Sequence, residues 1–280
     1  MPFRVEEDYA GRQLQGLRET QEDFYVFSDA AYDEQGHLSA LLLILADGMG
    51  GHAAGECASY ATVNGFLQGY HHQPGAVRQR LENALNRANQ AVADEAARDP
   101  QRLSGMGSTL VAAVIDQQSI HWVSVGDSLL LLFRDGRMLR LNADHSFAPM
   151  VEAQLANGEI VAGDADAMAL SNSLQSAIMG DALDLYDLPD APTPLLPGDI
   201  IIAATDGMLT LTDSRTQSLL RLLTNRPASE IAKVLLASVE AEHDTLQDNT
   251  TVTVVKIPAG TTAGAAIRKG PARRKHSTAT

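Results

Sequence analysis

The sequence has a single cysteine, few aromatic residues and no long apolar run. Cys57 alone excludes an internal disulfide framework and favours a reducing compartment. No stretch approaches the roughly 18 consecutive apolar residues that a membrane-crossing helix needs. The acidic first residues lack the apolar core of a signal peptide. We therefore expect a cytoplasmic protein without a membrane span.

Positive charge is also scarce, and it is unevenly placed. The 280 residues carry a net charge of −14, but five basic residues and no acidic ones lie from Pro258 onward. The preceding chain has 16 basic and 35 acidic residues, a net charge of −19, which argues against nucleic-acid binding. The basic segment 258–280 is typical of a disordered tail. The simplest interpretation is that this segment is a solvent-exposed chain end. The alternative is that it contacts an acidic partner or an anionic membrane.

Two apolar segments are near copies of each other, and both end at Asp-Gly. Residues 42–49 read LLILADGM and residues 200–208 read IIIAATDGM. A continuous apolar run of this length is typical of a strand buried on both faces. Asp47 and Asp206 should then lie at the rim of a sheet, where the following glycine lets a ligand approach the backbone.

Other acidic residues also stand at the ends of predicted strands. Asp127 follows an apolar run in Val-Gly-Asp-Ser, Asp248 precedes one, and Glu22 with Asp23 opens a third. Carboxylates from several strand ends, without a cluster of cysteine or histidine, suit hard cations such as Mg²⁺ or Mn²⁺. Two such ions about 4 Å apart generate a hydroxide near neutral pH and neutralise a phosphate group.

Two more residues complete this hypothesis. Gly48 has no side chain to block access to its carbonyl, and the fork of Arg18 suits a phosphate. Each residue alone has an ordinary interpretation. An isolated Asp-Gly is usually a turn, His52 and His145 are ordinary loop histidines, and Cys57 is a buried helix residue. Their joint arrangement favours the metal site.

Apolar spacing also predicts the main secondary structure. Helices are expected at about 53–68, at 77–96 and after Pro227. Strands are expected as successive antiparallel neighbours at 109–115, 120–125, 129–134 and 138–141. Residues 147–190 are acidic and rich in alanine, and we expect an irregular, mobile insertion there near the site.

Seven motifs follow one another in an order that resembles a known family. They are Gly16-Leu-Arg-Glu-Thr-Gln-Glu-Asp23, Ala46-Asp-Gly-Met-Gly-Gly-His52 with Gly55-Glu56, Gly107-Ser-Thr-Leu110, Val125-Gly-Asp-Ser128, Asp144-His-Ser146, Ala204-Thr-Asp-Gly207 and Asp248-Asn-Thr-Thr-Val252. From about Gly16 to Val255 the chain resembles metal-dependent protein serine/threonine phosphatases of the type 2C class, the PPM family, in their compact bacterial form.

The resemblance implies a fold and a division of the chain. The fold class is α+β, a four-layer α-β-β-α sandwich of two mainly antiparallel sheets flanked by helices. A catalytic domain would occupy residues 1–257, with a flap near 147–190, and the basic tail residues 258–280.

The resemblance also implies roles for the carboxylates. Asp47 would bridge two ions, Mn²⁺ or Mg²⁺, with the Gly48 carbonyl on one of them. Asp206 and Asp248 would bind the second ion. The bridging hydroxide would attack phosphorus in line, without a phosphoenzyme intermediate.

The remaining implied roles surround this pair of ions. Glu22 and Asp23 would hold metal-bound waters, and Asp127 with Asp206 would surround a weaker third ion. Arg18 would bind the substrate phosphate. His52 is the candidate general acid, because Met49 stands where eukaryotic relatives place a histidine.

Two further departures are Gln21, in place of the usual asparagine, and Leu129, in place of the arginine that commonly follows Gly-Asp-Ser. The implied function is hydrolysis of phosphoserine and phosphothreonine in protein substrates, opposing a bacterial serine/threonine kinase in signal transduction. A catalytically weak or inactive phosphoprotein-docking module of the same fold is the main alternative. A different two-metal hydrolase, such as a phosphodiesterase, is a third hypothesis that the lack of histidine ligands disfavours.

Overall fold

Strand β3 (Leu38–Met49) explains why the chain folds in layers, because both of its faces are apolar and buried. Leu41, Leu43 and Leu45 face one layer, and Leu42 and Ile44 face another. Successive side chains of a strand point to opposite faces, so a strand that is apolar throughout must be covered on both sides. The structure is a computed structural model that describes residues 2–51, 53–72, 74–161 and 163–258.

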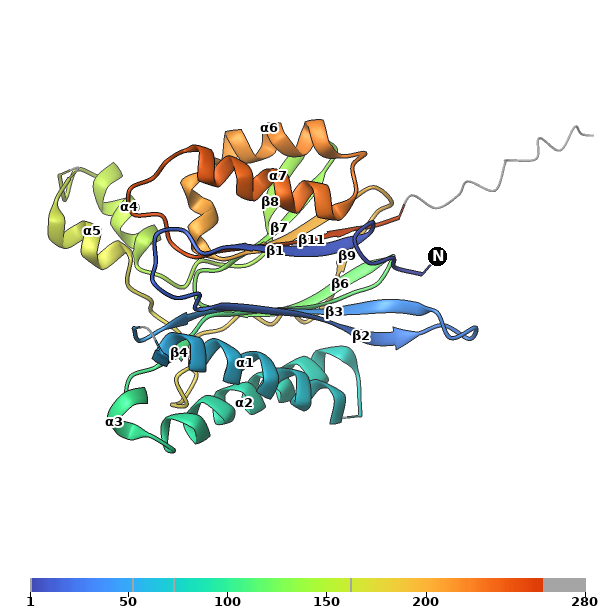
Figure 1. Cartoon of the computed structure of the whole chain (residues 1–280), viewed down its shortest axis with the longest axis horizontal. Coiled ribbons are helices and arrows are strands. Elements are labelled where there is room, and N and C mark those ends of the chain that lie inside the picture. The colour runs from blue at the N-terminus through green and yellow to red at the C-terminus, as the bar shows by residue number, and fades with distance from the viewer. Residues whose placement is uncertain (1, 52, 73, 162, 259–280) are drawn as a thin grey trace, which may run out of the picture.

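Two antiparallel sheets form the two inner layers (Figure 1). The five-stranded sheet contains, in spatial order, β1 (Tyr9–Leu14), β11 (Thr250–Lys256), β10 (Ile200–Ala204), β7 (Leu129–Arg134) and β8 (Arg137–Arg140). The six-stranded sheet contains β2 (Asp23–Tyr32), β3, β5 (Leu110–Ile115), β6 (Ser119–Val125) and β9 (Thr193–Pro194), with β4 (Gly107–Ser108) paired to the end of β3.

Helices cover the outer face of each sheet (Figure 1). Helices α1 (Ala53–His72) and α2 (Val77–Ala96) lie on the six-stranded sheet, and α6 (Asp213–Leu223) and α7 (Ala228–Ala241) lie on the five-stranded sheet. Short helices occur at α3 (Pro100–Leu103), α4 (Ala148–Ala156), α5 (Ala165–Ser171) and the 3₁₀ turn η1 (Asp206–Thr210). The predicted four-layer sandwich is confirmed.

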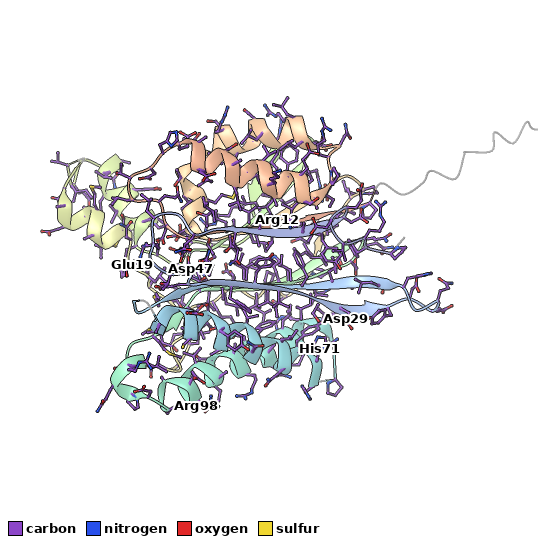
Figure 2. The ribbon with its side chains drawn as sticks, in the orientation of Figure 1. Arg12, Glu19, Asp29, Asp47, His71 and Arg98 are labelled. Atoms are coloured by element: carbon purple, nitrogen blue, oxygen red, sulfur yellow. The ribbon has the colours of Figure 1, made fainter. Side chains whose placement is uncertain are left out.

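A third apolar cluster fills the space between the sheets. Leu43 of β3 and Trp122 of β6 come from one sheet, and Leu130 of β7 and Ile201 of β10 come from the other. The sheets are therefore joined by a dry core that ends where the apolar runs end. Figure 2 shows Asp47 at that end of the sandwich.

The predicted strands 109–141 are right in position and partly wrong in pairing. Strands β5 and β6 are antiparallel neighbours, and so are β7 and β8. Strands β6 and β7 do not pair, because they lie in different sheets. The three-residue connection Gly126–Ser128 carries the chain from one sheet to the other, with Gly126 at φ +93°. The expectation that β6 and β7 are antiparallel neighbours is therefore wrong.

Residues 147–190 contain more regular structure than we expected. Helices α4 and α5 open this segment. The remainder pairs with the body through isolated bridges at Leu174, Ile178 and Asp187. Residues 259–280 of the predicted tail lie outside the described residues. None of the helices in the described part of the chain has the length and hydropathy needed to cross a bilayer.

Helices α1 and α2 approach closely because α1 presents two glycines to α2. A Cβ atom built on Gly65 would lie 2.6 Å from the Cβ of Ala91 and 3.0 Å from the Cα of Ala88. At Gly69 the corresponding distance to the Cα of Ala84 is 2.8 Å. These distances leave no room for a side chain between the helices.

We expect Gly65→Val to lower the free energy of unfolding by about 1–3 kcal/mol, because overpacking forces the two helices apart. The control is Gln68→Ala on the exposed side of the same helix, which should change stability by less than about 0.5 kcal/mol. Urea unfolding followed by circular dichroism measures both. A Gly65→Val protein as stable as the parent would contradict this account of the helix pair.

Candidate functional site

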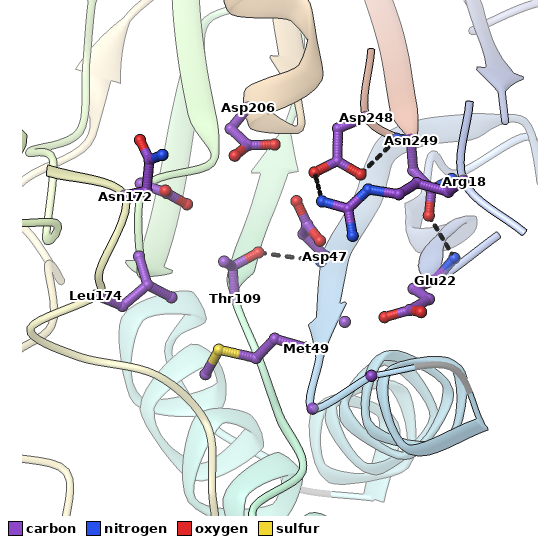
Figure 3. Close-up of a pocket in the computed structure, with 14 residues that line it drawn as sticks. Arg18, Glu22, Asp47, Met49, Thr109, Asn172, Leu174, Asp206, Asp248 and Asn249 are labelled. Atoms are coloured by element: carbon purple, nitrogen blue, oxygen red, sulfur yellow. Dashed lines mark hydrogen bonds and ion pairs between the residues drawn. The ribbon is translucent and has the colours of Figure 1, made fainter. Parts of the chain in front are cut away.

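Acidic side chains from five parts of the chain meet at the end of the inter-sheet core. They line a cavity of about 220 Å³, which we call the carboxylate pocket. Figure 3 shows Asp47, Asp206 and Asp248 directed toward one space, with Arg18 and Glu22 to one side. The acidic residues that line it are Glu22, Asp47, Asp127, Asp206 and Asp248.

Asp47 is positioned by the backbone pairing at the end of β3. Strand β3 continues past Asp47 to Met49, because β4 pairs with its end. Asp47 N donates to Thr109 Oγ1 at 3.0 Å, and Asp47 O accepts from Thr109 N at 2.8 Å. Burial, then the charges of Asp23 and Asp206, raises the pKa of Asp47 well above its ordinary value.

Asp23 lies directly opposite Asp47, since the two residues are partners in the β2–β3 register. Asp23 is 3% exposed, and its Oδ2 accepts from Thr205 Oγ1 at 2.9 Å and Thr251 Oγ1 at 2.7 Å. Its Oδ1 is buried without a hydrogen-bond partner. Burial raises the pKa of Asp23 to about 6. Thr251 lies in β11 and Thr205 directly follows β10, so Asp23 connects its own sheet to the five-stranded sheet.

Asp127 stands on the connection that crosses between the sheets. Arg140 of β8 donates to the Asp127 carbonyl at 2.8 Å and to Asp144 at 3.2 Å. Burial, followed by the charge of Asp144, raises the pKa of Asp127. Sequence reasoning noted Leu129 in place of an arginine but missed Arg140, which reaches this connection from the neighbouring strand.

His145 fixes the same connection from behind. It is 3% exposed, and its Nδ1 accepts from Gly126 N at 3.3 Å. Its backbone N donates to Gly126 O at 3.1 Å. Its Nε2 lies 3.6 Å from Asp187 Oδ1. His145 therefore lies in a loop, as its ordinary interpretation has it, but it is buried between the crossing turn and the flap and holds them together.

Asp206 and Asp248 approach the pocket from the five-stranded sheet. Asp206 begins η1 directly after β10, and burial and the charge of Asp127 raise its pKa to about 7. Asp248 precedes β11 and accepts from Arg18 Nη2 at 2.5 Å (Figure 3). The exposed guanidinium of Arg18 is therefore held at the rim by one of the carboxylates it faces.

Asn249 organises the loop that carries Arg18 and Glu22. Its Oδ1 accepts from Glu22 N at 2.8 Å, and its Nδ2 donates to the carbonyls of Gln15 and Thr20 at 2.8 and 2.9 Å. Sequence reasoning quoted Asn249 within a motif but assigned it no role. An amide can accept and donate at once, which suits a side chain that must hold three points of one loop.

Glu22 packs against the first turn of α1. A Cβ atom on Gly55 would lie 2.0 Å from Glu22 Oε2, so a side chain there would displace this carboxylate. Gly48 is equally confined, since its Cβ position lies 2.0 Å from Gly55 O. The glycines of the Asp-Gly and Gly-Glu motifs are thus required by the close approach of β3, α1 and Glu22.

The opposite wall of the pocket comes from the flap. Asn172 and Leu174 face the carboxylates across the cavity, with Met49 at its base (Figure 3). None of these three residues was predicted as part of the site. His52, the candidate general acid, lies outside the described residues. All the other predicted site residues line the pocket except Asp23, which is buried behind Asp47.

The donor set is oxygen-rich and strongly repulsive. Each of Asp47, Asp127 and Asp206 has a raised pKa to which a neighbouring carboxylate contributes. In the described part of the chain, no three His, Cys, Asp or Glu side chains converge tightly enough to surround one ion. The arrangement suits hard cations that take one or two carboxylates each and complete their shells with carbonyl oxygens and water.

We expect Thr251→Val to weaken Mn²⁺ binding about tenfold, because a mobile Asp23 no longer supports Asp47. The control is Thr253→Val on the same strand, since Thr253 Oγ1 donates to Ala203 O at 2.8 Å, away from the carboxylates. Both variants should lose about 1 kcal/mol of stability. Calorimetric titration with Mn²⁺ separates them, and equal affinities in the two variants would contradict the role given to Thr251.

The raised pKa values predict a specific pH dependence for the metal-free protein. A carboxyl whose pKa is higher in the folded state binds more protons there, so its contribution to stability falls as pH rises from about 4 toward 7. We expect Asp206→Asn to stabilise the metal-free protein at pH 8 and to lose this advantage progressively toward pH 4. Urea unfolding in EDTA measures the difference. Asp213→Asn, at an exposed position on α6, is the control, and an advantage independent of pH would contradict the prediction.

Comparison with known proteins identifies the family to which this arrangement belongs. Residues 26–243 match the family model described as Protein phosphatase 2C. The chain is 30% identical over 177 residues to the serine/threonine protein phosphatase PstP of Mycobacterium tuberculosis, covering 63% of this chain and 32% of PstP. It is 30% identical over 223 residues to the serine/threonine phosphatase stp of Listeria innocua, covering 77% of this chain and 84% of stp.

A solved structure agrees with these sequence matches. The catalytic domain of PstP in complex with two manganese ions matches with a TM-score of 0.68 and 27% identity, over 89% of this chain and 96% of that one. The chain spans about a third of the length of the full PstP sequence. The family model covers most of the chain, from β2 to the end of α7. The chain therefore belongs to the protein phosphatase 2C family.

Proposed function

We propose that this protein is a metal-dependent phosphatase that hydrolyses phosphoserine and phosphothreonine in proteins. The observation that carries the proposal is the carboxylate pocket, in which acidic residues from five parts of the chain surround one cavity beside Arg18. Family membership and the names of its relatives support the same reaction. Mn²⁺ or Mg²⁺ is the expected cofactor, and the PstP catalytic domain has been solved with two manganese ions.

The residues present fit such ions. Asp23 Oδ1 is buried without a partner, and Asp47 and Asp206 face like charges that a cation would neutralise. Five carboxylates line the cavity, and hard divalent cations prefer oxygen donors. The small number of side chains per ion matches Mg²⁺ and Mn²⁺ sites, which retain several waters.

We assign the metal-holding roles as the family resemblance implies. Asp47 would hold both ions, with the Gly48 carbonyl on one of them. Asp206 and Asp248 would hold the second. Bound ions supply an acidified water near neutral pH and neutralise the phosphate charge.

Other residues would act around this centre. Glu22 and Asp23 would orient water molecules in the metal shells, and Asp127 with Asp206 would hold a weaker third ion. The guanidinium of Arg18 would leave Asp248 and bind two phosphate oxygens through its planar fork. His52 stays the candidate donor of a proton to the serine or threonine leaving oxygen.

The wider setting is also part of the proposal. A bacterial serine/threonine kinase would produce the phosphoproteins that this enzyme hydrolyses. A cytoplasmic location stays a prediction that the single free cysteine supports. The division into a catalytic domain, a flap and a basic tail likewise stays a prediction. The docking-module alternative is not favoured, because every predicted carboxylate and Arg18 are retained in one arrangement.

We expect Asp206→Asn to lower Mn²⁺-dependent release of phosphate from a phosphothreonine peptide by at least roughly 100-fold, because the second ion loses a ligand. Asp213→Asn should leave the rate within twofold. Phosphate release is measured with Mn²⁺, with Mg²⁺ and with EDTA. A folded, Mn²⁺-bound parent protein without turnover would reject the proposed activity and favour the docking module.

A further inference from the structure

A second pocket lies beside the carboxylate pocket, on the far side of the loop that carries Arg18. Its volume is about 300 Å³, and we call it the leucine pocket. It lies between the loop from β1 to β2 and the loop from α7 to β11, and Figure 1 shows both loops at the same end of the sandwich as α4 and α5. The lining residues are Leu14, Gly16, Leu17, Val239, Glu240, His243, Asp244, Thr245 and Gln247.

The two pockets share their dividing wall. Leu17 lines the leucine pocket and the next residue, Arg18, lines the carboxylate pocket. In the same way, Gln247 lines the leucine pocket and Asp248 lines the carboxylate pocket. Consecutive Cα atoms are about 3.8 Å apart, so a ligand that reaches Arg18 lies within a few residues of the leucine pocket.

The dividing wall is rigid. Leu17 N donates to Gln247 O at 2.9 Å. Gly16 has φ +64°, and a Cβ there would lie 2.5 Å from the carbonyl oxygens of both Gln247 and Asp248. The wall is therefore closely packed backbone, and the leucine pocket exists before any ligand binds.

Leucines stand exposed on the two loops that form this pocket. Leu17, which lines the pocket, is 67% exposed, and Leu246, which lies between the lining residues Thr245 and Gln247, is 84% exposed. Leu246 is held outward by a tight turn, in which its backbone N donates to Asp244 Oδ1 at 2.8 Å. These two leucines present aliphatic surface to solvent at the pocket.

We infer that the leucine pocket binds an aliphatic side chain of the phosphoprotein substrate, two to four residues from the phosphorylated residue. This inference rests on the proposed function and adds a substrate preference to it. Leu14, Leu17 and Val239 supply the apolar wall. Glu240 and Asp244 supply negative charge, which favours a basic residue next to the aliphatic one. The protein thus selects aliphatic and basic sequences around the phosphate.

The test moves one leucine through the four positions on each side of phosphothreonine, in a peptide of alanine and arginine. We expect one or two positions to raise kcat/KM about tenfold over the all-alanine peptide, or about 1.4 kcal/mol. Replacing the arginines by glutamates should lower kcat/KM again. Peptide affinity is measured in parallel by fluorescence anisotropy, which does not need turnover.

Variants of the protein then test whether this sequence preference depends on the leucine pocket. Leu17→Ala and Leu246→Ala should each lower the ratio of kcat/KM for the best peptide to kcat/KM for p-nitrophenyl phosphate by about five- to tenfold. Leu222→Ala, 79% exposed on α6, is the matched control and should leave this ratio unchanged. Glu240→Lys should remove the preference for arginine, whereas Glu230→Lys near the other end of α7 should not.

The outcomes separate this inference from the proposed function. An unchanged ratio in Leu17→Ala and Leu246→Ala, with p-nitrophenyl phosphate still hydrolysed, overturns the leucine pocket alone. Peptide binding that both variants lose, in a protein without turnover, supports the pocket and overturns the activity. A dimer in light scattering that dissociates in Leu246→Ala would assign the surface to a second copy of the chain and overturn the inference.

Discussion

Repulsion between buried carboxylates is the constraint on which the rest of the structure depends. Asp23 and Asp47 are directly opposed on adjacent strands, a position where like charges are unfavourable. The charge of Asp248 raises the pKa of both. An isolated loop could not hold these groups together, because it would move them apart into water. They stay together because each follows or begins a strand whose position is fixed by apolar packing on both faces.

That framework is completed by neutral polar side chains that cross between the sheets. Thr205 and Thr251 reach Asp23 from the five-stranded sheet, and Asn249 reaches Glu22 from the same side. Their hydrogen bonds hold the acidic groups without neutralising them. A lysine in place of any of these residues would supply the missing positive charge and compete with a metal ion. Because these side chains are neutral, the negative charge of the carboxylates stays uncompensated and still favours binding of a cation.

The sequence revealed the strands of the core and the acidic residues, because both have strong local signals. Buried runs such as 200–204 and the apolar periodicity of 77–96 depend on nearby residues alone. The sheet change at Gly126–Ser128 could not be predicted in this way, since a three-residue connection is typical of a hairpin. Strand β1 was missed because it has no apolar run, and it is a strand only through pairing with β11. Likewise, Asn172 enters the site only through the path of the flap.

The two walls of the carboxylate pocket differ in how tightly they pack against the body of the protein. We relate this difference to the part of the substrate that each wall contacts. The wall of Arg18 and Asp248 is closely packed backbone with no room for a Cβ at Gly16. The flap wall is attached to the body through isolated bridges and through the contacts of His145 and Asp187. A phosphate has the same geometry in every phosphoprotein, so the residues that meet it benefit from a rigid wall. Surrounding peptide sequences differ, and the flap wall, built from two short helices and isolated bridges and not from a sheet, is the one that can adjust to them.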